Sequence, residues 1–327
     1  MKIISHALLL LVISSSCLAA ETSVDRKAEL GGVLDTIASS YAYLTLDTHQ
    51  FAQLRQTYLV KASKPISNRE YIQLLEQLAD EFHDNHLQLN TNLANSYRLV
   101  PSGTALTATW RDGAAVVSAL APSAPAFLST AVRPGDVVFR INGVPVDAAV
   151  AKRLAGHIDH DSMPARQWAL NSLLAGRRNE ATSLELQSDS QAKLVTIPPG
   201  QLFSRPSTDL SYCRLPDNAH YIRVNDSLGR MNLIKEIGEL LPRFSDSHRI
   251  VLDLRDTPSG GNSLVARAIL SHFVSTELPY QKHELPADER DYGVPRRWLE
   301  LVSPIATHLS NDVQVLVGPW TGSMGEG

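Results

Sequence analysis

The chain has 327 residues, of which 43% are hydrophobic, so it is long enough to bury cores in two or three domains. Its formal net charge of -4 gives no general basic field, which argues against nucleic acid or an anionic membrane surface as a partner. No segment reaches the roughly 18 consecutive apolar residues that a membrane-spanning helix needs.

The first twenty residues have the pattern of an export signal. Lys2 supplies a positive start, Ala7 to Ile13 form a short apolar stretch, and Cys17 to Ala20 give a small-residue cleavage region. We therefore expect a signal peptide over residues 1–20 and an exported, periplasmic protein in a bacterium-like context. A lipid anchor at Cys17 is a minor alternative, and so is secretion.

Neither metal nor cofactor chemistry is indicated. His83 and His86 are three residues apart, but no third ligand follows at a recognisable interval, so we expect no metal site. No dinucleotide or phosphate-binding motif is present, and we expect no cofactor. Cys213 is the only cysteine after the signal, which excludes an intrachain disulfide. We expect Cys213 to be a small buried residue and not a reactive thiol.

Residues 21–98 form a predicted N-terminal helical segment. Val24 to Val60 lack proline and are rich in helix-forming residues, which predicts one or two helices. A capping box, Ser67 to Glu70, begins the next helix, whose apolar face repeats from Tyr71 to Phe82 at helical spacing. This helix ends at a junction that contains Asn85 and His86. A polar loop with incidental histidines is the plainer interpretation of that junction, and a catalytic base is the other.

Residues 99–200 form a predicted β-rich module. Strands are expected over the ranges 105–109, 114–119, 137–141 and 183–186, with turns at Asp112-Gly113 and Asn142-Gly143. The stretch from Val132 to Val146 resembles the PDZ domain of exported proteases. That resemblance implies capture of an extended peptide as an added strand, although Ser102 to Leu106 replaces the glycine-rich carboxylate loop.

Residues 201–327 alternate strands and helices, which predicts an α/β core with parallel pairing. Buried strands are expected at Tyr221 to Val224, Arg249 to Leu254 and Val313 to Val317, and an irregular surface excursion at Tyr280 to Pro304. The last of these strands leads to a turn that carries Ser323. A serine between small residues at such a turn exposes its hydroxyl, although Thr321 stands where the usual elbow has glycine.

The order of these features resembles the S41 family of serine peptidases, the C-terminal processing and tail-specific proteases. The resemblance rests on the junction at His86, the PDZ-like insert, the Asp-Leu-Arg strand followed by Gly260-Gly261, and the closing Thr-Gly-Ser-Met-Gly-Glu. It implies a multidomain α+β protein with a ClpP/crotonase-like α/β peptidase core. The core is expected to be incomplete at its C-terminal end, because relatives continue beyond the motif's glutamate.

The resemblance also implies roles for individual residues. Ser323 would be the nucleophile, and His86 the base, as in the tricorn-like branch. Gly260, Gly261 and Met324 would form the oxyanion hole, and Asn85 and Glu326 would support the catalytic pair. The leading hypothesis is an exported serine endopeptidase that acts on polypeptides, recognised in part by their C-termini. The alternatives are a non-catalytic periplasmic peptide-binding protein on an inert scaffold and a poorly folding, inactive product. The oligomeric state is left open.

Overall fold

The described part of the chain comprises residues 25–44, 46–89, 93–188, 191–200 and 203–326 of a computed structural model. The predicted signal peptide, residues 1–20, lies outside these ranges. Within them, no helix has both the length and the apolar character to cross a membrane. Three hydrophobic cores organise the described residues, one for the N-terminal helices and one for each of two larger sheets.

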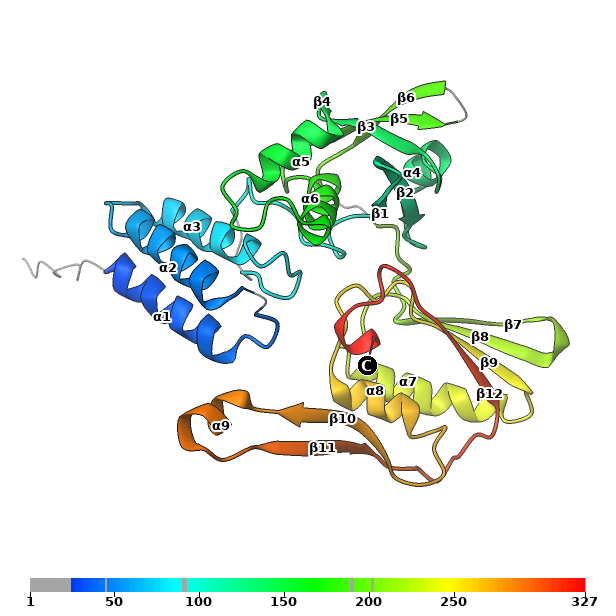
Figure 1. Ribbon diagram of the computed structural model, residues 1–327. Helices are drawn as coiled ribbons and strands as arrows, with labels where there is room; N and C mark the ends of the chain where they lie inside the picture. Colours follow the sequence, from blue (N-terminus) through cyan, green and yellow to red (C-terminus); the bar gives the residue numbers. More distant parts are fainter. Residues whose placement is uncertain (1–24, 45, 90–92, 189–190, 201–202, 327) are drawn as a thin grey trace, which may run out of the picture.

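The predicted N-terminal helices are present, and they lie side by side (Figure 1). They are α1 (Arg26–Ser40), α2 (Thr48–Ala62) and α3 (Asn68–Asp80). The capping box of α3 is confirmed, because the Ser67 side chain accepts from the Glu70 N–H while the Glu70 carboxylate accepts from the Ser67 N–H at 2.7 Å. The three helices bury their leucine and tyrosine side chains against one another. This packing fixes the C-terminal end of α3 relative to α1 and α2.

The β-rich module contains a six-stranded sheet in the order β1-β2-β3-β5-β6, with β4 paired to β3. Its strands confirm the four expected ones and add two: β1 (Leu106–Arg111), β2 (Ala114–Leu120), β3 (Val137–Ile141), β4 (Val144–Pro145), β5 (Thr182–Ser188) and β6 (Gln191–Ile197). Both predicted turns are present, with positive φ at Asp112, Gly113, Asn142 and Gly143. Three helices that were not predicted from the sequence pack here, α4 (Ala126–Ala131), α5 (Val146–Leu154) and α6 (Met163–Ala175).

The C-terminal sheet has the order β12-β9-β8-β7, and β9 is parallel to both of its neighbours, as predicted. Its elements in chain order are β7 (Leu210–Arg214), η1 (Pro216–Asn218), β8 (Ala219–Val224), α7 (Asn232–Leu240), η2 (Leu241–Phe244), β9 (Arg249–Asp253), α8 (Ser263–Leu270) and β12 (Asp312–Leu316). Because parallel strands end at one edge, β9 and β12 deliver their following loops to the same place.

Three expectations about this region are wrong. The strand β12 is not buried, since it is the terminal strand in the sheet order and Val315 is 51% exposed. Cys213 is exposed, because it lies on the terminal strand β7. Residues 280–304 are not irregular: they belong to an arm formed by β10 (Leu278–Glu284), α9 (Pro286–Tyr292) and β11 (Arg297–Val302), seen in Figure 1.

Trp320 connects the loop after β12 to the core of the β-rich module. It is the largest fully buried side chain of the described residues, with 1% of its surface exposed. It packs among the apolar residues of the six-stranded sheet, and its indole Nε1–H donates to the Thr104 carbonyl at 2.7 Å. The turn that carries Ser323 is therefore fixed to the β-rich module three residues before the serine.

Replacing Trp320 by alanine should lower the free energy of unfolding by about 3–5 kcal/mol, because it opens a cavity and leaves the Thr104 carbonyl without its donor. Urea unfolding followed by circular dichroism measures this change. Trp298→Ala is the matched control, since Trp298 is 44% exposed on β11 and should cost less than about 1 kcal/mol. Equal losses for the two variants would contradict the anchoring role of Trp320.

Candidate active site

Ser323 lies in a strained turn with an exposed hydroxyl. It begins a short 3-10 helix, Ser323–Gly325, and has a φ of 50°, in the left-handed region that L-residues avoid. Within the described residues its hydroxyl makes no hydrogen bond. Strain of this kind persists only where surrounding contacts hold it, and it clusters at functional sites.

Two buried threonines hold this turn against the loop after β9. Thr257 and Thr321 each donate a hydroxyl hydrogen bond to the Leu254 carbonyl, at 2.9 and 2.8 Å. The same two residues form a parallel bridge, and the Gly322 N–H donates to the Thr257 carbonyl at 3.2 Å. Thr321, which breaks the usual Gly-x-Ser-x-Gly pattern, is thus a structural tie between the loops. This role was not predicted from the sequence.

Gly260 lies directly on Ser323. Its φ is +64°, and a Cβ at this position would lie 2.5 Å from the Ser323 Cβ and 3.0 Å from the Met324 nitrogen. The neighbouring Gly261 is equally constrained, because a Cβ there would lie 2.2 Å from the carbonyl carbon of Leu228. Only glycine fits at either position, so the double glycine brings the backbone of one loop against the serine of the other.

The backbone N–H groups around Ser323 differ in their availability. The Gly260 N–H donates to the Thr257 carbonyl at 3.0 Å, so Gly260 is not a free donor, contrary to expectation. The Gly261 and Met324 N–H groups find no acceptor among the described residues. These two groups are free to donate to an oxygen that carries developing negative charge beside Ser323.

His86 follows α3 with an exposed imidazole, and an acidic partner lies beside it. Its Nδ1 is 3.5 Å from Oδ1 of Asp84, which also accepts the His86 backbone N–H at 2.8 Å. The other Asp84 oxygen accepts the Tyr41 hydroxyl at 2.7 Å. Burial and the bond to Asp84 raise the pKa of Tyr41, so the phenol remains a donor. Asp84 was not predicted as a site residue. Its position two residues before His86 could have indicated a carboxylate near the imidazole.

The second histidine of the junction, His83, has a different environment. Its Nε2 lies 3.2 Å from Nδ1 of His157, and its ring stands 5.0 Å from that of Trp168. Burial lowers the pKa of His83. His83 is therefore held in an aromatic cluster, whereas the imidazole of His86 is open to the solvent.

A cleft of about 810 Å³ is lined by both predicted catalytic residues, Ser323 and His86. Its lining includes the junction at His86, the turn at Ser323, the exposed carboxylate of Glu326, Asn85 and part of β1. Among the described residues, no hydrogen bond joins the Ser323 hydroxyl to His86, and Glu326 forms no ion pair. In the same part of the chain, no three His, Cys, Asp or Glu side chains are grouped as a metal site would require.

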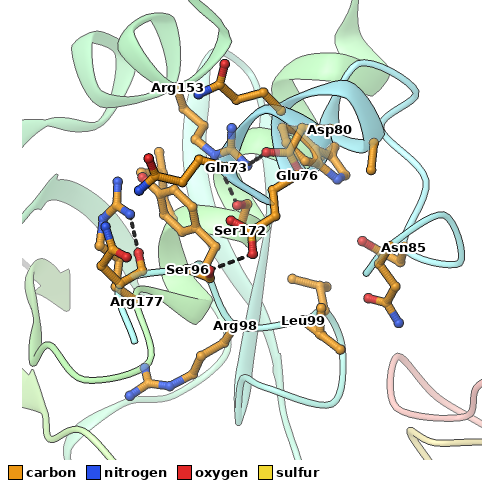
Figure 2. Close-up of a pocket in the computed structure, with 18 of the residues that line it drawn as sticks. Gln73, Glu76, Asp80, Asn85, Ser96, Arg98, Leu99, Arg153, Ser172 and Arg177 are labelled. Carbon is orange, nitrogen blue, oxygen red and sulfur yellow. Dashed lines mark hydrogen bonds and ion pairs between the residues drawn. The ribbon is translucent and has the colours of Figure 1, made fainter. Parts of the chain in front are cut away.

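Next to the cleft is a second cavity, of about 630 Å³, and part of its lining is drawn in Figure 2. The two share several lining residues, among them Asp84 and Asn85. Across this cavity the Arg153 guanidinium binds the Asp80 carboxylate at 2.7 Å, at the end of α3 (Figure 2). The helix that precedes His86 is thereby tied to the β-rich module, which fixes where the junction starts.

Comparison with known proteins supports the fold alone. No family model matches the chain, and no curated protein matches it. Among solved structures it is similar to the photosystem II D1 C-terminal processing protease, with a TM-score of 0.50, 15% identity and coverage of 92% of this chain and 76% of that one. It is also similar to mature CPAF, with a TM-score of 0.56, 13% identity and coverage of 92% and 80%. The chain shares the mixed helix and sheet fold of these two proteins.

The half-buried pair of His83 and His157 predicts how stability depends on pH. Burial, then the positive charge of Arg153, lowers the pKa of His157 from 6.5 to about 3. Below pH 6.5 the His157 side chain takes up a proton in the unfolded chain but stays neutral in the folded chain. The stability that the neutral His157 contributes is therefore fully present above pH 6.5 and is lost as the pH falls towards 3. In melting curves His157→Gln should lose less stability over this range than the wild type. The exposed His160→Gln should behave as wild type, and equal slopes for all three would contradict the burial argument.

Proposed function

We propose that the protein is a serine endopeptidase. The Ser323 oxygen attacks a peptide carbonyl carbon while His86 takes the hydroxyl proton, and the Gly261 and Met324 N–H groups bind the resulting oxyanion. As the peptide bond breaks, His86 returns the proton to the leaving amine, and water then hydrolyses the acyl-enzyme. The observation that carries this proposal is the close packing of Gly260 on Ser323 beside two free N–H groups.

Asp84 is a positioning residue in this proposal. Its carboxylate, held by the Tyr41 hydroxyl, lies 3.5 Å from Nδ1 of His86. A carboxylate there favours the tautomer with a proton on Nδ1 and stabilises the imidazolium that forms when His86 takes the Ser323 proton. The chain thus holds an acidic partner close to the histidine in sequence. Glu326 and Asn85 then serve as polar walls of the cleft.

The setting of this activity is proposed from the sequence. The signal-like pattern of residues 1–20 supports a periplasmic location. Its substrates are proposed to be unfolded or tail-presenting polypeptides. One structural neighbour is named as a C-terminal processing protease, which agrees with polypeptide substrates.

A non-catalytic peptide-binding protein is the second candidate. It is favoured by the open geometry of the cleft, in which no hydrogen bond joins the Ser323 hydroxyl to His86 within the described residues. Catalytic hydrogen bonds often tighten only when substrate is bound, so a peptidase can also have this open pair before its substrate binds.

A fluorophosphonate probe distinguishes these two candidates. The proposed peptidase should be labelled at Ser323, and Ser323→Ala should not be labelled. His86→Gln should slow labelling by about 10²–10⁴-fold, because it removes the base. The control His160→Gln replaces an exposed histidine of the β-rich module and should label at the wild-type rate. Labelling of Ser323→Ala equal to wild type would exclude Ser323 as the nucleophile.

Asp84→Asn tests the positioning residue. The variant keeps the size of the side chain but replaces the carboxylate beside His86, so it should slow labelling by about tenfold or more. Stopped-flow labelling with the same probe measures the rate, and a melting curve checks the fold. Asp35→Asn, a change at an exposed carboxylate on α1, is the matched control. A wild-type rate for Asp84→Asn would remove Asp84 from the mechanism.

A further inference from the structure

The arm formed by β10, α9 and β11 is fixed at both of its ends. Near its base, Glu300 of β11 accepts a hydrogen bond from the Ser263 hydroxyl and pairs with the Arg267 guanidinium of α8, each at 3.0 Å. At its tip, the Arg290 guanidinium donates to the Ser39 carbonyl of α1 at 2.6 Å. A two-stranded hairpin is marginally stable alone, so these contacts hold the arm in its place between the C-terminal sheet and the N-terminal helices (Figure 1).

The base of the arm contacts the residue that follows Ser323. The Tyr280 hydroxyl donates to the Met324 sulfur at 2.8 Å, and Gln281 Nε2 lies 3.9 Å from the same atom. Burial, then the charge of Glu300, raises the pKa of Tyr280, so the phenol remains a donor. The strand β10 therefore starts beside the N–H group that is proposed to bind the oxyanion.

One face of the arm continues from this contact. Residues that are opposed in an antiparallel pair, or that lie two apart along one strand, present their side chains on one face. Gln281 is opposite Glu300, and His283 is opposite Trp298. These four side chains therefore form a row that starts at the Met324 sulfur and ends at Trp298.

The row ends in an exposed aromatic platform. The rings of His283 and Trp298 are stacked, with centroids 4.8 Å apart and an angle of 10° between their planes. His283 Nε2 lies 3.3 Å from the Glu300 carboxylate, which holds the imidazole in place. Trp298 keeps 44% of its surface exposed. An exposed indole that is held in this way offers contact area to another apolar or aromatic side chain.

The other face of the arm has a different character. Lys282 and Arg297 both form ion pairs with Glu284, at 2.6 and 3.5 Å. Leu299, opposite Lys282, lies on this face and is exposed. The aromatic platform thus belongs to the face that leads to Ser323, whereas the other face carries paired surface charges.

The charges beside the platform indicate the class of side chain that it suits. The Arg296 guanidinium lies 5.7 Å from the centroid of the Trp298 ring, and it pairs with Asp288 at 3.4 Å. The Glu300 carboxylate is already bound by α8, as described above. Both carboxylates are therefore neutralised, and a basic side chain would meet the charge of Arg296. The platform suits a neutral aromatic or large aliphatic side chain.

We propose that the platform formed by Trp298 and His283 is a substrate subsite that selects a neutral aromatic or large aliphatic side chain of the polypeptide. The inference rests on the proposed function, because the bound chain is the substrate whose scissile bond lies at Ser323. The platform lies one residue pair beyond Gln281, which is roughly 7 Å along the strand from the contact at Met324. It therefore reads a side chain about two to four residues from the scissile bond, on one side of that bond only.

Fluorescence anisotropy in the Ser323→Ala background measures the selection. Three labelled peptides of alanine, serine and glycine carry phenylalanine, alanine or lysine at the same central position. The phenylalanine peptide should bind about tenfold more tightly than the other two, because it gains a desolvated contact with the Trp298 ring. Trp298→Ala should abolish this preference and leave the affinity for the alanine peptide unchanged. Trp298→Phe keeps an aromatic ring and should retain part of the preference.

Leu299→Ala is the matched control, because Leu299 is 55% exposed on the opposite face of the same strand. It should keep the full preference for phenylalanine, and a melting curve for each variant checks the fold. The position of the subsite is read from the active Ser323 protein by mass spectrometry of the cleavage products. Moving the phenylalanine by one residue along the peptide should move the cleaved bond by one residue in the same direction.

The proposal is overturned if the phenylalanine peptide binds no better than the alanine peptide, if Trp298→Ala keeps the preference, or if Leu299→Ala loses it equally. It is also overturned if Trp298→Ala dissociates a dimer in sedimentation without changing the preference, because the platform would then be a contact between copies of this chain. If Trp298→Ala does not melt cooperatively, Trp298→Phe decides, since it should weaken the preference.

The two proposals fail separately. A preference for phenylalanine without fluorophosphonate labelling of the Ser323 protein would support the subsite and refute the peptidase. Labelling of Ser323 without that preference would support the peptidase and refute the subsite.

Discussion

The close approach of two loops, one after β9 and one after β12, is the constraint on which the candidate site depends. Parallel pairing of the two strands brings the loops to one edge, and Thr257 and Thr321 tie them through the Leu254 carbonyl. Gly260 then lies so near Ser323 that any side chain on it would clash. The strained backbone of Ser323 depends on this packing, because contacts with the loop after β9 hold it in place. The free N–H groups of Gly261 and Met324 lie in the same pair of loops.

The remaining parts of the site are attached to this pair of loops. Trp320 anchors the serine turn in the core of the β-rich module, and the fully buried Asp256 accepts the Ser123 hydroxyl of that module at 2.9 Å. From the other side, the Asp80–Arg153 ion pair ties α3 to the same module. The β-rich module thus positions both Ser323 and His86, and residues of its strand β1 line the same cleft.

The elements with strong local signals were predictable from the sequence. The capping box at Ser67 to Glu70, the turn at Asn142-Gly143 and the parallel order of the core are all found. The expectations that failed depend on contacts between distant segments. The exposure of β12 and of Cys213 follows from the place of their strands at the two ends of the sheet.

The sequence predicted candidate site residues, and their roles stay predictions; their geometry could not be predicted. Ser323 and His86 line one cleft and Gly260 packs on Ser323, whereas the occupied Gly260 N–H and the position of Asp84 beside His86 required coordinates. A crystal structure of the fluorophosphonate adduct tests the proposed mechanism most directly. The mechanism predicts a phosphonyl group on the Ser323 oxygen, with its free oxygen about 2.7–3.1 Å from the nitrogens of Gly261 and Met324. An adduct on another residue, or an oxygen turned away from both N–H groups, would contradict it.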